Sequence, residues 1–312
     1  MNDISILLSG VTKRFGDNTA VRDLDLAVPR GSIYGLLGPN GAGKTTTIRI
    51  ILDIIGADAG EVSVLGSSDI DTVRSRIGYL PEERGLYQKM KVVELLEFFG
   101  ELKGLPRKEA RRKAIAGLET LDLADRADER VDTFSKGMQQ KVQFLATVLH
   151  RPELLVLDEP FSGLDPLNVD LIKKIVLDLA REGTTVLFST HLIEDAERLC
   201  ERVCMIAGAS KVLDGTVSEV KAATGRQEVA IAFEGSSSFL EAPGLVERVS
   251  DHGRYVEVRL VDGADPQRLL ERAVSAGVRL NRFELIEPSL REIFIEKAHR
   301  AGLSIEPQMD AA

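Results

Sequence analysis

Short apolar runs alternate with stretches of helical periodicity over the first two-thirds of the chain. The runs Ser32–Leu37, Leu154–Leu157 and Thr185–Ser189 are bounded and show no polar alternation. Helical periodicity follows at Thr45–Ile55 and at Asn168–Arg181. Fully apolar strands interleaved with helices are typical of parallel sheets covered on both faces. The pattern therefore predicts an α/β fold around a mostly parallel sheet.

Two departures from this pattern divide the chain. Val92–Asp132 is rich in Leu, Glu, Lys, Arg and Ala and lacks strand signals, which predicts an inserted helical subdomain over about 92–132. The pattern changes near Thr216, where Ser218–Thr224 reads as a helix closed by Gly225. We expect a first domain over 1–224, a small α+β domain over 225–300 and a flexible tail over 301–312.

The smaller domain is predicted from alternating strands and two helices. An Asp-His-Gly turn between two of the apolar segments indicates a hairpin. A last helix begins after Pro288. The other expected elements are, in order, the strands Glu228–Phe233, Leu245–Ser250 and Tyr255–Val261, the helix Pro266–Ser275 and the strand Arg279–Ile286.

Composition and charge exclude some classes of function but do not identify one. The 312 residues are 44% apolar and 29% charged, an ordinary globular balance. The formal charge of −9 argues against nucleic acid as a partner. No stretch approaches the roughly 20 apolar residues of a membrane span, and the amino terminus lacks a signal-peptide core, so we expect a soluble cytosolic chain. Cys200 and Cys204 are spaced to share one helix face, and we expect buried, inert thiols.

A phosphate-binding loop is the strongest local signal. Gly38–Thr45 reads GPNGAGKT and matches G-x-x-x-x-G-K-[ST] between a predicted strand and a predicted helix. Its glycines let backbone N–H groups face an anion, the Lys44 ammonium reaches the β- and γ-phosphates, and the Thr45 hydroxyl can ligate magnesium. A purely structural glycine corner is the alternative. The predicted nucleotide-binding residues here are Gly38, Pro39, Asn40, Gly41, Ala42, Gly43, Lys44, Thr45 and Thr46.

Two later strands end on residues that suit nucleotide hydrolysis. Leu154–Glu159 reads LLVLDE, so the strand delivers two carboxylates at its carboxyl end. Asp158 is predicted to hold the metal through a water and Glu159 to act as general base. His191 follows the strand within Leu187–His191. It is either a satisfied histidine or a contact to the γ-phosphate.

Together these motifs resemble the ATP-binding subunit of an ABC transporter, over about residues 4–215. The decisive addition is Phe134–Gln139, FSKGMQ, which matches the family's signature (usually LSGGQ) at Ser135 and Gly137. It departs by having Phe134 for Leu, Lys136 for Gly and Met138 for Gln. Further matches are the D-loop ending at Asp165, the switch histidine His191, and Phe15 in the place of the adenine-stacking aromatic.

The resemblance implies a mechanism and partners. ATP and Mg²⁺ bound by Lys44 and Thr45 of one protomer would be covered by Ser135 and Gly137 of the other in a head-to-tail homodimer, with Asp165 at the same nucleotide site. Closure and opening of that dimer would drive integral membrane subunits encoded as separate chains. The subunit itself would then lie peripherally on the inner face of the cell membrane.

Two further segments point to a subtype. Gly78–Tyr87, GYLPEERGLY, and Glu287–Glu296, EPSLREIFIE, look most like subunits of drug-, antibiotic- or sodium-efflux exporters that carry a small carboxy-terminal domain. An importer subunit, or a soluble ABC ATPase acting on RNA or the ribosome, is the alternative. Where most members of the family have a Gln that contacts magnesium, this chain has Glu82, which we expect to be a metal ligand.

Overall fold

The structure, a computed structural model, describes residues 3–83, 85–223, 227–300 and 302. It divides into two compact units, one running to Asp214 and also taking in the chain from Ala298, the other covering Gly215–Lys297. This division falls earlier than the predicted boundary after residue 224. The predicted helix closure at Gly225 and, apart from residue 302, the predicted tail over 301–312 lie outside the described residues.

A mostly parallel sheet forms the centre of the first unit, and the expected α/β class is confirmed. In the described residues the sheet has six strands in the order β5-β6-β7-β3-β8-β9. The pairs β5–β6, β6–β7, β7–β3 and β3–β8 are parallel. The strands are β3 (Ile33–Leu37), β5 (Ile77–Leu80), β6 (Leu154–Asp158), β7 (Thr185–Thr190), β8 (Arg202–Ala207) and β9 (Ser210–Thr216).

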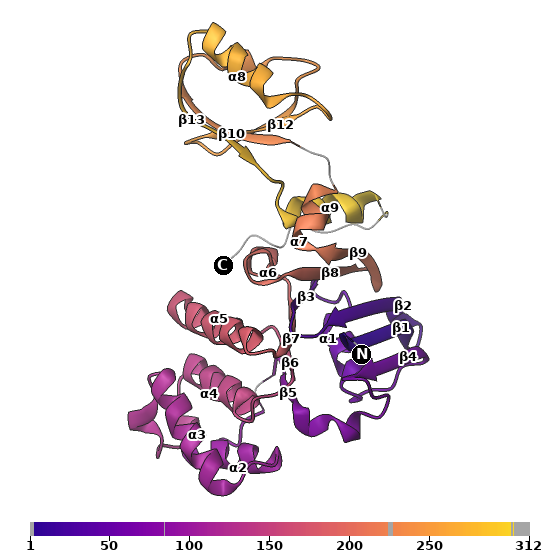
Figure 1. Ribbon diagram of the computed structural model, residues 1–312, viewed down its shortest axis with the longest axis vertical. Helices are drawn as coiled ribbons and strands as arrows, with labels where there is room; N and C mark the ends of the chain where they lie inside the picture. The colour runs from indigo at the N-terminus through magenta and orange to yellow at the C-terminus, as the bar shows by residue number, and fades with distance from the viewer. Residues whose placement is uncertain (1–2, 84, 224–226, 301, 303–312) are drawn as a thin grey trace. The chain divides into compact units, whose positions relative to one another are not determined.

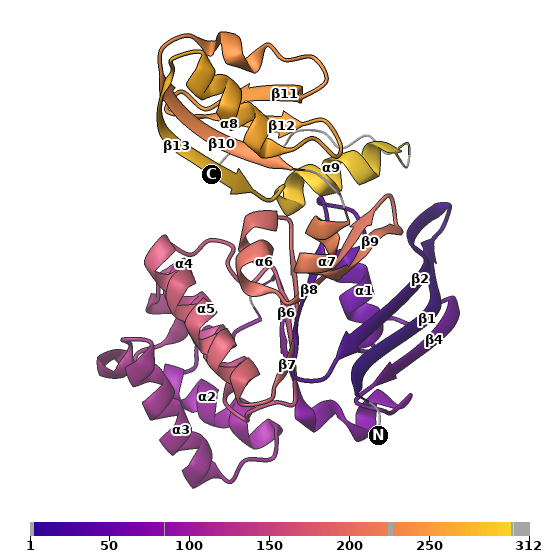
Figure 2. The ribbon, with the colours of Figure 1, turned by 45° about the horizontal axis from the view of Figure 1, so that its top comes forward.

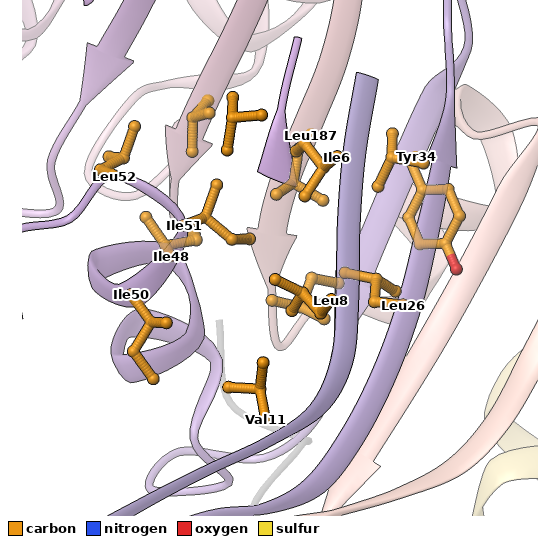
Figure 3. Close-up of a cluster of buried hydrophobic side chains, with 14 of the residues drawn as sticks. Ile6, Leu8, Val11, Leu26, Tyr34, Ile48, Ile50, Ile51, Leu52 and Leu187 are labelled. Atoms are coloured by element: carbon orange, nitrogen blue, oxygen red, sulfur yellow. The ribbon is translucent and has the colours of Figure 1, made fainter. Parts of the chain in front are cut away.

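An antiparallel sheet lies beside this core and shares a helix with it. Its strands, in the order β2-β1-β4, are β1 (Ile4–Phe15), β2 (Asn18–Pro29) and β4 (Ala59–Val64). Helix α1 (Lys44–Ile51) lies between the two sheets (Figure 1). Figure 3 shows Ile48 and Ile51 of this helix facing Ile6 and Leu8 of β1 across the buried cluster. Burial from both sides fixes the direction in which α1 leaves the phosphate loop.

The opposite face of the parallel sheet is covered by helices, which Figure 2 shows on the side away from α1. The predicted helical subdomain contains α2 and α3, and α4 packs with them in one apolar cluster. The helices here are α2 (Val92–Leu102), α3 (Arg107–Thr120), α4 (Lys136–Val148), α5 (Pro166–Arg181) and α6 (Ile193–Leu199). No helix among the described residues is both long and apolar enough to cross a bilayer.

The second unit has an antiparallel sheet in the order β11-β12-β10-β13 and a core centred on Ile231, Val258 and Leu269. The predicted hairpin turn is present: the Gly253 N–H donates to Asp251 Oδ1 over 2.7 Å. The elements are α7 (Val217–Ala222), β10 (Glu228–Glu234), β11 (Val246–Asp251), β12 (Val256–Leu260), α8 (Pro266–Ser275), β13 (Arg279–Ile286) and α9 (Leu290–Arg300).

Two local expectations are wrong. The helix predicted over Thr45–Ile55 ends at Ile51, because Asp53 takes a left-handed backbone (φ 52°) and the Ile54 N–H donates back to Arg49 O. Ile55 lies in the loop after the helix but still packs on the core, which is why the apolar periodicity of the sequence continues beyond the end of α1. Cys200 and Cys204 do not share a helix, since Cys200 ends α6 and Cys204 lies in β8; both are free and buried, as expected.

Candidate nucleotide-binding site

The phosphate loop joins β3 to α1 in a path that only glycine permits at two points. A Cβ on Gly43 would lie 2.2 Å from Ala20 O, and one on Gly38 would lie 2.2 Å from Ile206 O. Gly43 also has a φ of 108°, in the region that L side chains rarely adopt. The loop is thereby pressed against β2 and β8. The first turn of α1, with its unpaired N–H groups, opens on the cavity that the loop encloses.

That cavity has a volume of about 750 Å³. It brings together segments that are far apart in the sequence: the loop after β3, the turn between β1 and β2, and the residues that follow β5, β6 and β8. Its size and polar walls fit a nucleotide. The residues that line it are Phe15, Asp17, Asn18, Thr19, Ala20, Arg22, Asn40, Gly41, Ala42, Gly43, Lys44, Thr45, Thr46, Glu82, Glu159, Gly208 and Ala209.

Lys44 is the buried cation of the site. Its side chain is 6% exposed, and Nζ donates to Gly38 O over 2.8 Å and to Pro39 O over 3.3 Å. The same Nζ lies 3.5 Å from Glu159 Oε1. The ammonium is therefore held inside the loop, with a carboxylate beside it where the terminal phosphate of a nucleotide would carry its charge.

Glu159 sits at a strained point of the backbone directly after β6. Its φ is 48°, a left-handed value that a non-glycine residue adopts only where its surroundings impose it. The Glu159 N–H donates to Ser189 O over 3.1 Å, which ties the residue to β7. Its Oε1 lies 3.0 Å from His191 Nδ1. The structure thus brings Lys44, Glu159 and His191 together at one carboxylate oxygen.

Asp158 offers an oxygen to a metal. The residue is fully buried, and Ser189 Oγ donates to its Oδ1. Its Oδ2 has no hydrogen-bond partner among the described residues. Burying a carboxylate oxygen without a partner is unfavourable, so this atom fits a cation or a metal-bound water. Asp158 is not itself among the residues lining the nucleotide cavity, whereas its neighbour Glu159 is, together with Thr45 and Glu82, whose side-chain oxygens could also bind a metal.

Seven predicted site residues are not among those lining this cavity. Gly38, Pro39 and Asp158 are close in sequence to lining residues and His191 contacts Glu159, whereas Ser135, Gly137 and Asp165 lie at the starts of two other helices. Ser135 caps α4, its Oγ accepting from the Met138 N–H over 3.3 Å, and Asp165 caps α5, accepting from the Asn168 N–H over 3.1 Å. Gly137 is half-buried in the first turn of α4, where the nearest atom to an added Cβ is Leu164 Cδ2 at 3.8 Å. Each lies at the start of a helix, where N–H groups are open to an anion.

Sequence reasoning missed part of the cavity wall. Asn18 and Arg22 come from the start of β2, and Gly208 and Ala209 come from the turn between β8 and β9. The signal for Asn18 is its position directly after the two-residue turn, Gly16 and Asp17, that follows Phe15. Nothing local marks Gly208 and Ala209, because the Arg22 N–H to Ala209 O bond that brings them here joins distant parts of the chain.

Comparison with known proteins gives the family. The model of the ABC transporter family matches residues 21–162. The ABC transporter ATP-binding protein YhaQ of Bacillus subtilis is 41% identical over 94% of this chain and 98% of its own length. The chain belongs to the family of ABC transporter ATP-binding proteins. Like other members it binds ATP and hydrolyses it.

Three further similarities extend this assignment. The model of the carboxy-terminal domain of DrrA1-3-like ATP-binding proteins matches residues 215–298 of this ABC subunit. The daunorubicin/doxorubicin resistance ATP-binding protein DrrA of Streptomyces peucetius is 33% identical over 93% of this chain and 91% of its own. A solved ATP-binding subunit of an ABC transporter superposes with a TM-score of 0.67 at 30% identity, covering 70% of this chain and 93% of that one.

Proposed function

We propose that this ABC subunit drives the export of a drug, antibiotic or ion through separate integral membrane subunits. The observation that carries the proposal is the carboxy-terminal unit, whose family model is that of DrrA-type proteins, joined to an ABC unit with a complete phosphate cavity. An importer would use the same cavity. The distinguishing experiment is purification of the subunit from membranes, with identification of the integral protein that accompanies it.

The cavity supports a division of labour for hydrolysis. The N–H groups between Gly38 and Thr46 receive the phosphates, and Lys44 leaves Glu159 to pair with the β- and γ-phosphates. Glu159, freed of that cation, orients and deprotonates the attacking water, and His191 fixes the carboxylate while donating toward the γ-phosphate. Phe15, exposed on one side of the cavity, stacks on the adenine ring.

Magnesium fits the oxygen donors of this site. Thr45 would ligate it directly, Asp158 Oδ2 would hold it through a water, and Glu82 would add a second carboxylate. Bound there, the ion neutralises charge on the β- and γ-phosphates.

Glu82 has a matched neighbour that tests this assignment. Glu82 lines the cavity, whereas the adjacent Glu83 does not. If Glu82 is a ligand, Glu82→Gln keeps ATPase activity but requires more free Mg²⁺ for its half-maximal rate, while Glu83→Gln leaves the Mg²⁺ dependence unchanged. An unchanged Mg²⁺ dependence in both variants contradicts the assignment.

The exposed starts of α4 and α5 support a head-to-tail homodimer. Ser135, Gly137 and Asp165 of one protomer would complete the nucleotide site of the other, which explains why none of them lines the cavity of its own chain. Mixing Lys44→Ala and Ser135→Ala subunits tests this arrangement. One intact composite site should restore part of the activity that each variant lacks, whereas mixed dimers without any rescue would argue against composite sites.

An apolar surface formed by Tyr87 and by Phe98 and Leu102 of α2 supports docking of the membrane subunit there. Tyr87, Phe98 and Leu102 are 55%, 39% and 65% exposed, and the Tyr87 and Phe98 rings meet edge to face at 5.7 Å. They lie next to a cavity of about 230 Å³ that includes Leu102 and Phe99. Exposed aromatic clusters of this kind mark interfaces.

The docking proposal predicts a separation of activities. Phe98→Ser should reduce capture of the membrane partner while leaving the ATPase rate of the purified subunit unchanged. Val274→Ser, which removes an apolar side chain from α8 that is even more exposed (65% against 39% for Phe98), serves as the control. Equal capture by both variants would count against this surface.

A further inference from the structure

Arg126 lies over the segment that carries the signature residues. It ends a short 3₁₀ turn at Ala124–Arg126. Its guanidinium carbon is 4.6 Å from the centroid of the Phe134 ring, and its Nη1 is 3.3 Å from Met138 Sδ. Phe134 and Met138 stand on either side of Ser135, and both are positions where this chain departs from the family's usual Leu and Gln.

A carboxylate fixes the orientation of this guanidinium. Arg126 Nε donates to Glu129 Oε1 over 2.9 Å and Nη2 to Glu129 Oε2 over 2.5 Å, a two-pronged pairing. The same Oε2 accepts from Thr133 Oγ1 over 3.1 Å. Hydrogen bonds from Arg126 lower the pKa of Glu129, so both groups are charged at neutral pH. The guanidinium plane is thereby set over the ring of Phe134.

The other side of the signature turn is anchored by the backbone. Gln139 Nε2 donates to Val131 O over 3.2 Å and to Phe134 O over 3.0 Å. Phe134 itself is buried in the apolar cluster of the helical side. Between these two anchors Ser135 is exposed. Its Oγ caps α4, and its carbonyl oxygen accepts from the Gln139 N–H over 2.9 Å. The direction in which Ser135 and Gly137 face therefore depends on how Phe134 and Met138 are held.

We propose that Arg126 is a positioning residue that, through Phe134 and Met138, holds Ser135 and Gly137 in the conformation that receives the nucleotide of the second protomer. The inference rests on the head-to-tail dimer proposed above. Because the Arg126 side chain is 37% exposed, its cation–π contact with Phe134 should contribute about 0.5–1 kcal/mol, the range for solvent-accessible sites, which is about a two- to fivefold change in an equilibrium. Arg126 is not among the residues lining the nucleotide cavity of its own chain, so ATP binding by the monomer should not depend on it.

The test uses a matched pair of arginines in the same segment. Arg126 and Arg130 have side chains 37% and 48% exposed, and each pairs with an acidic residue, but only Arg126 contacts Phe134 and Met138. Arg126→Gln and Arg130→Gln are made in a Glu159→Gln background, and their MgATP-dependent self-association is measured by sedimentation. Equilibrium binding of MgATP at protein concentrations too low for association is measured beside it.

Arg126→Gln should weaken self-association about two- to fivefold per site without changing MgATP binding, whereas Arg130→Gln should change neither. With Glu159 restored, Arg126→Gln should lower kcat with little change in KM. Because Arg126 is proposed to act through the Phe134 ring, Arg126→Gln should weaken self-association less in a protein that already carries Phe134→Leu. Arg126→Lys, which keeps a cation but not the two-pronged pairing, should recover part of the association.

The possible failures are distinguishable. Ser135→Ala in the same background reports on the dimer itself. If Ser135→Ala weakens association but Arg126→Gln and Arg130→Gln behave alike, the role of Arg126 is overturned while the dimer stands. If Ser135→Ala has no effect, the proposed dimer is overturned and the role of Arg126 with it. A loss of MgATP binding in Arg126→Gln would mean that the residue supports the whole fold, which also overturns the proposal.

Discussion

Replacing Glu159 by Gln is the sharpest test of the catalytic assignment. The residue is buried, and its Oε1 lies 3.0 Å from His191 Nδ1 and 3.5 Å from Lys44 Nζ. Gln preserves the length and shape of the side chain and can still contact His191. What it removes is the negative charge and the capacity to accept a proton from water.

The expected loss of rate follows from the role of a general base. Such a group contributes about 10²–10⁴-fold to a reaction, which corresponds to about 3–5 kcal/mol of activation free energy. The affinity of Glu159→Gln for MgATP should rise or stay unchanged. The carboxylate that competes for Lys44 is gone, and one negative charge is removed from the neighbourhood of the γ-phosphate.

Phosphate release at saturating MgATP and equilibrium binding of MgATP, measured on the same preparation, separate the two effects. Glu182→Gln, a change of the same charge at an exposed glutamate after α5, is the control. A Glu159→Gln rate within about threefold of the wild type would refute the assignment of the base. Loss of MgATP binding would instead mean that Glu159 is needed to hold Lys44 in the loop.

Three other changes test separate parts of the molecule. Lys13 Nζ lies 5.5 Å from the centroid of the Phe15 ring, so Lys13→Met should weaken ATP binding about two- to fivefold but leave inorganic triphosphate binding unchanged in equilibrium titrations. Burial lowers the pKa of His150 to about 4 from 6.5, so the unfolded chain takes up a proton first as the pH falls and the folded state loses stability between these values. Urea unfolding of His150→Gln across that range should show a shallower decline, by at most about 3 kcal/mol in total. The buried Tyr34 hydroxyl donates to Asp214 Oδ1 over 2.6 Å, so Tyr34→Phe should lower the free energy of urea unfolding by about 1–3 kcal/mol.

The core of the fold can be predicted from the sequence because its strands and helices show uniform, short-range patterns of apolar residues. The apolar strand ending at Asp158 needs no distant partner to be recognised, and its carboxylate must emerge at the edge where parallel strands end. The glycines of the phosphate loop can be recognised in the sequence for a similar reason. At Gly43 an added Cβ would meet Ala20 O at 2.2 Å, so no side chain fits there and no alternative residue obscures the pattern.

The parts that sequence reasoning did not reach depend on long-range contacts. Gly208 enters the nucleotide cavity because the neighbouring Ala209 accepts a backbone hydrogen bond from Arg22 in β2. The contact between Lys44 and Glu159 joins two recognisable motifs, yet neither motif indicates that the ammonium rests on that carboxylate. Helix α1 ends before the predicted Ile55 for a related reason. Ile55 is apolar because it packs on the core from the loop, and its apolar character is therefore no sign of helix.

The signature segment shows why a motif can change at some positions and keep its geometry. Ser135 and Gly137 act through properties that few residues can supply: an oxygen that caps α4 by accepting from the Met138 N–H, and a first-turn position that adds no side chain of its own. Phe134 and Met138 act by packing, and packing depends on volume and on the neighbour across the contact. A larger ring at position 134 offers a face that a leucine lacks, and Arg126 covers it at 4.6 Å. The substitution is therefore intelligible only together with a residue outside the motif, and the double change of Arg126 and Phe134 measures how strongly the two are coupled.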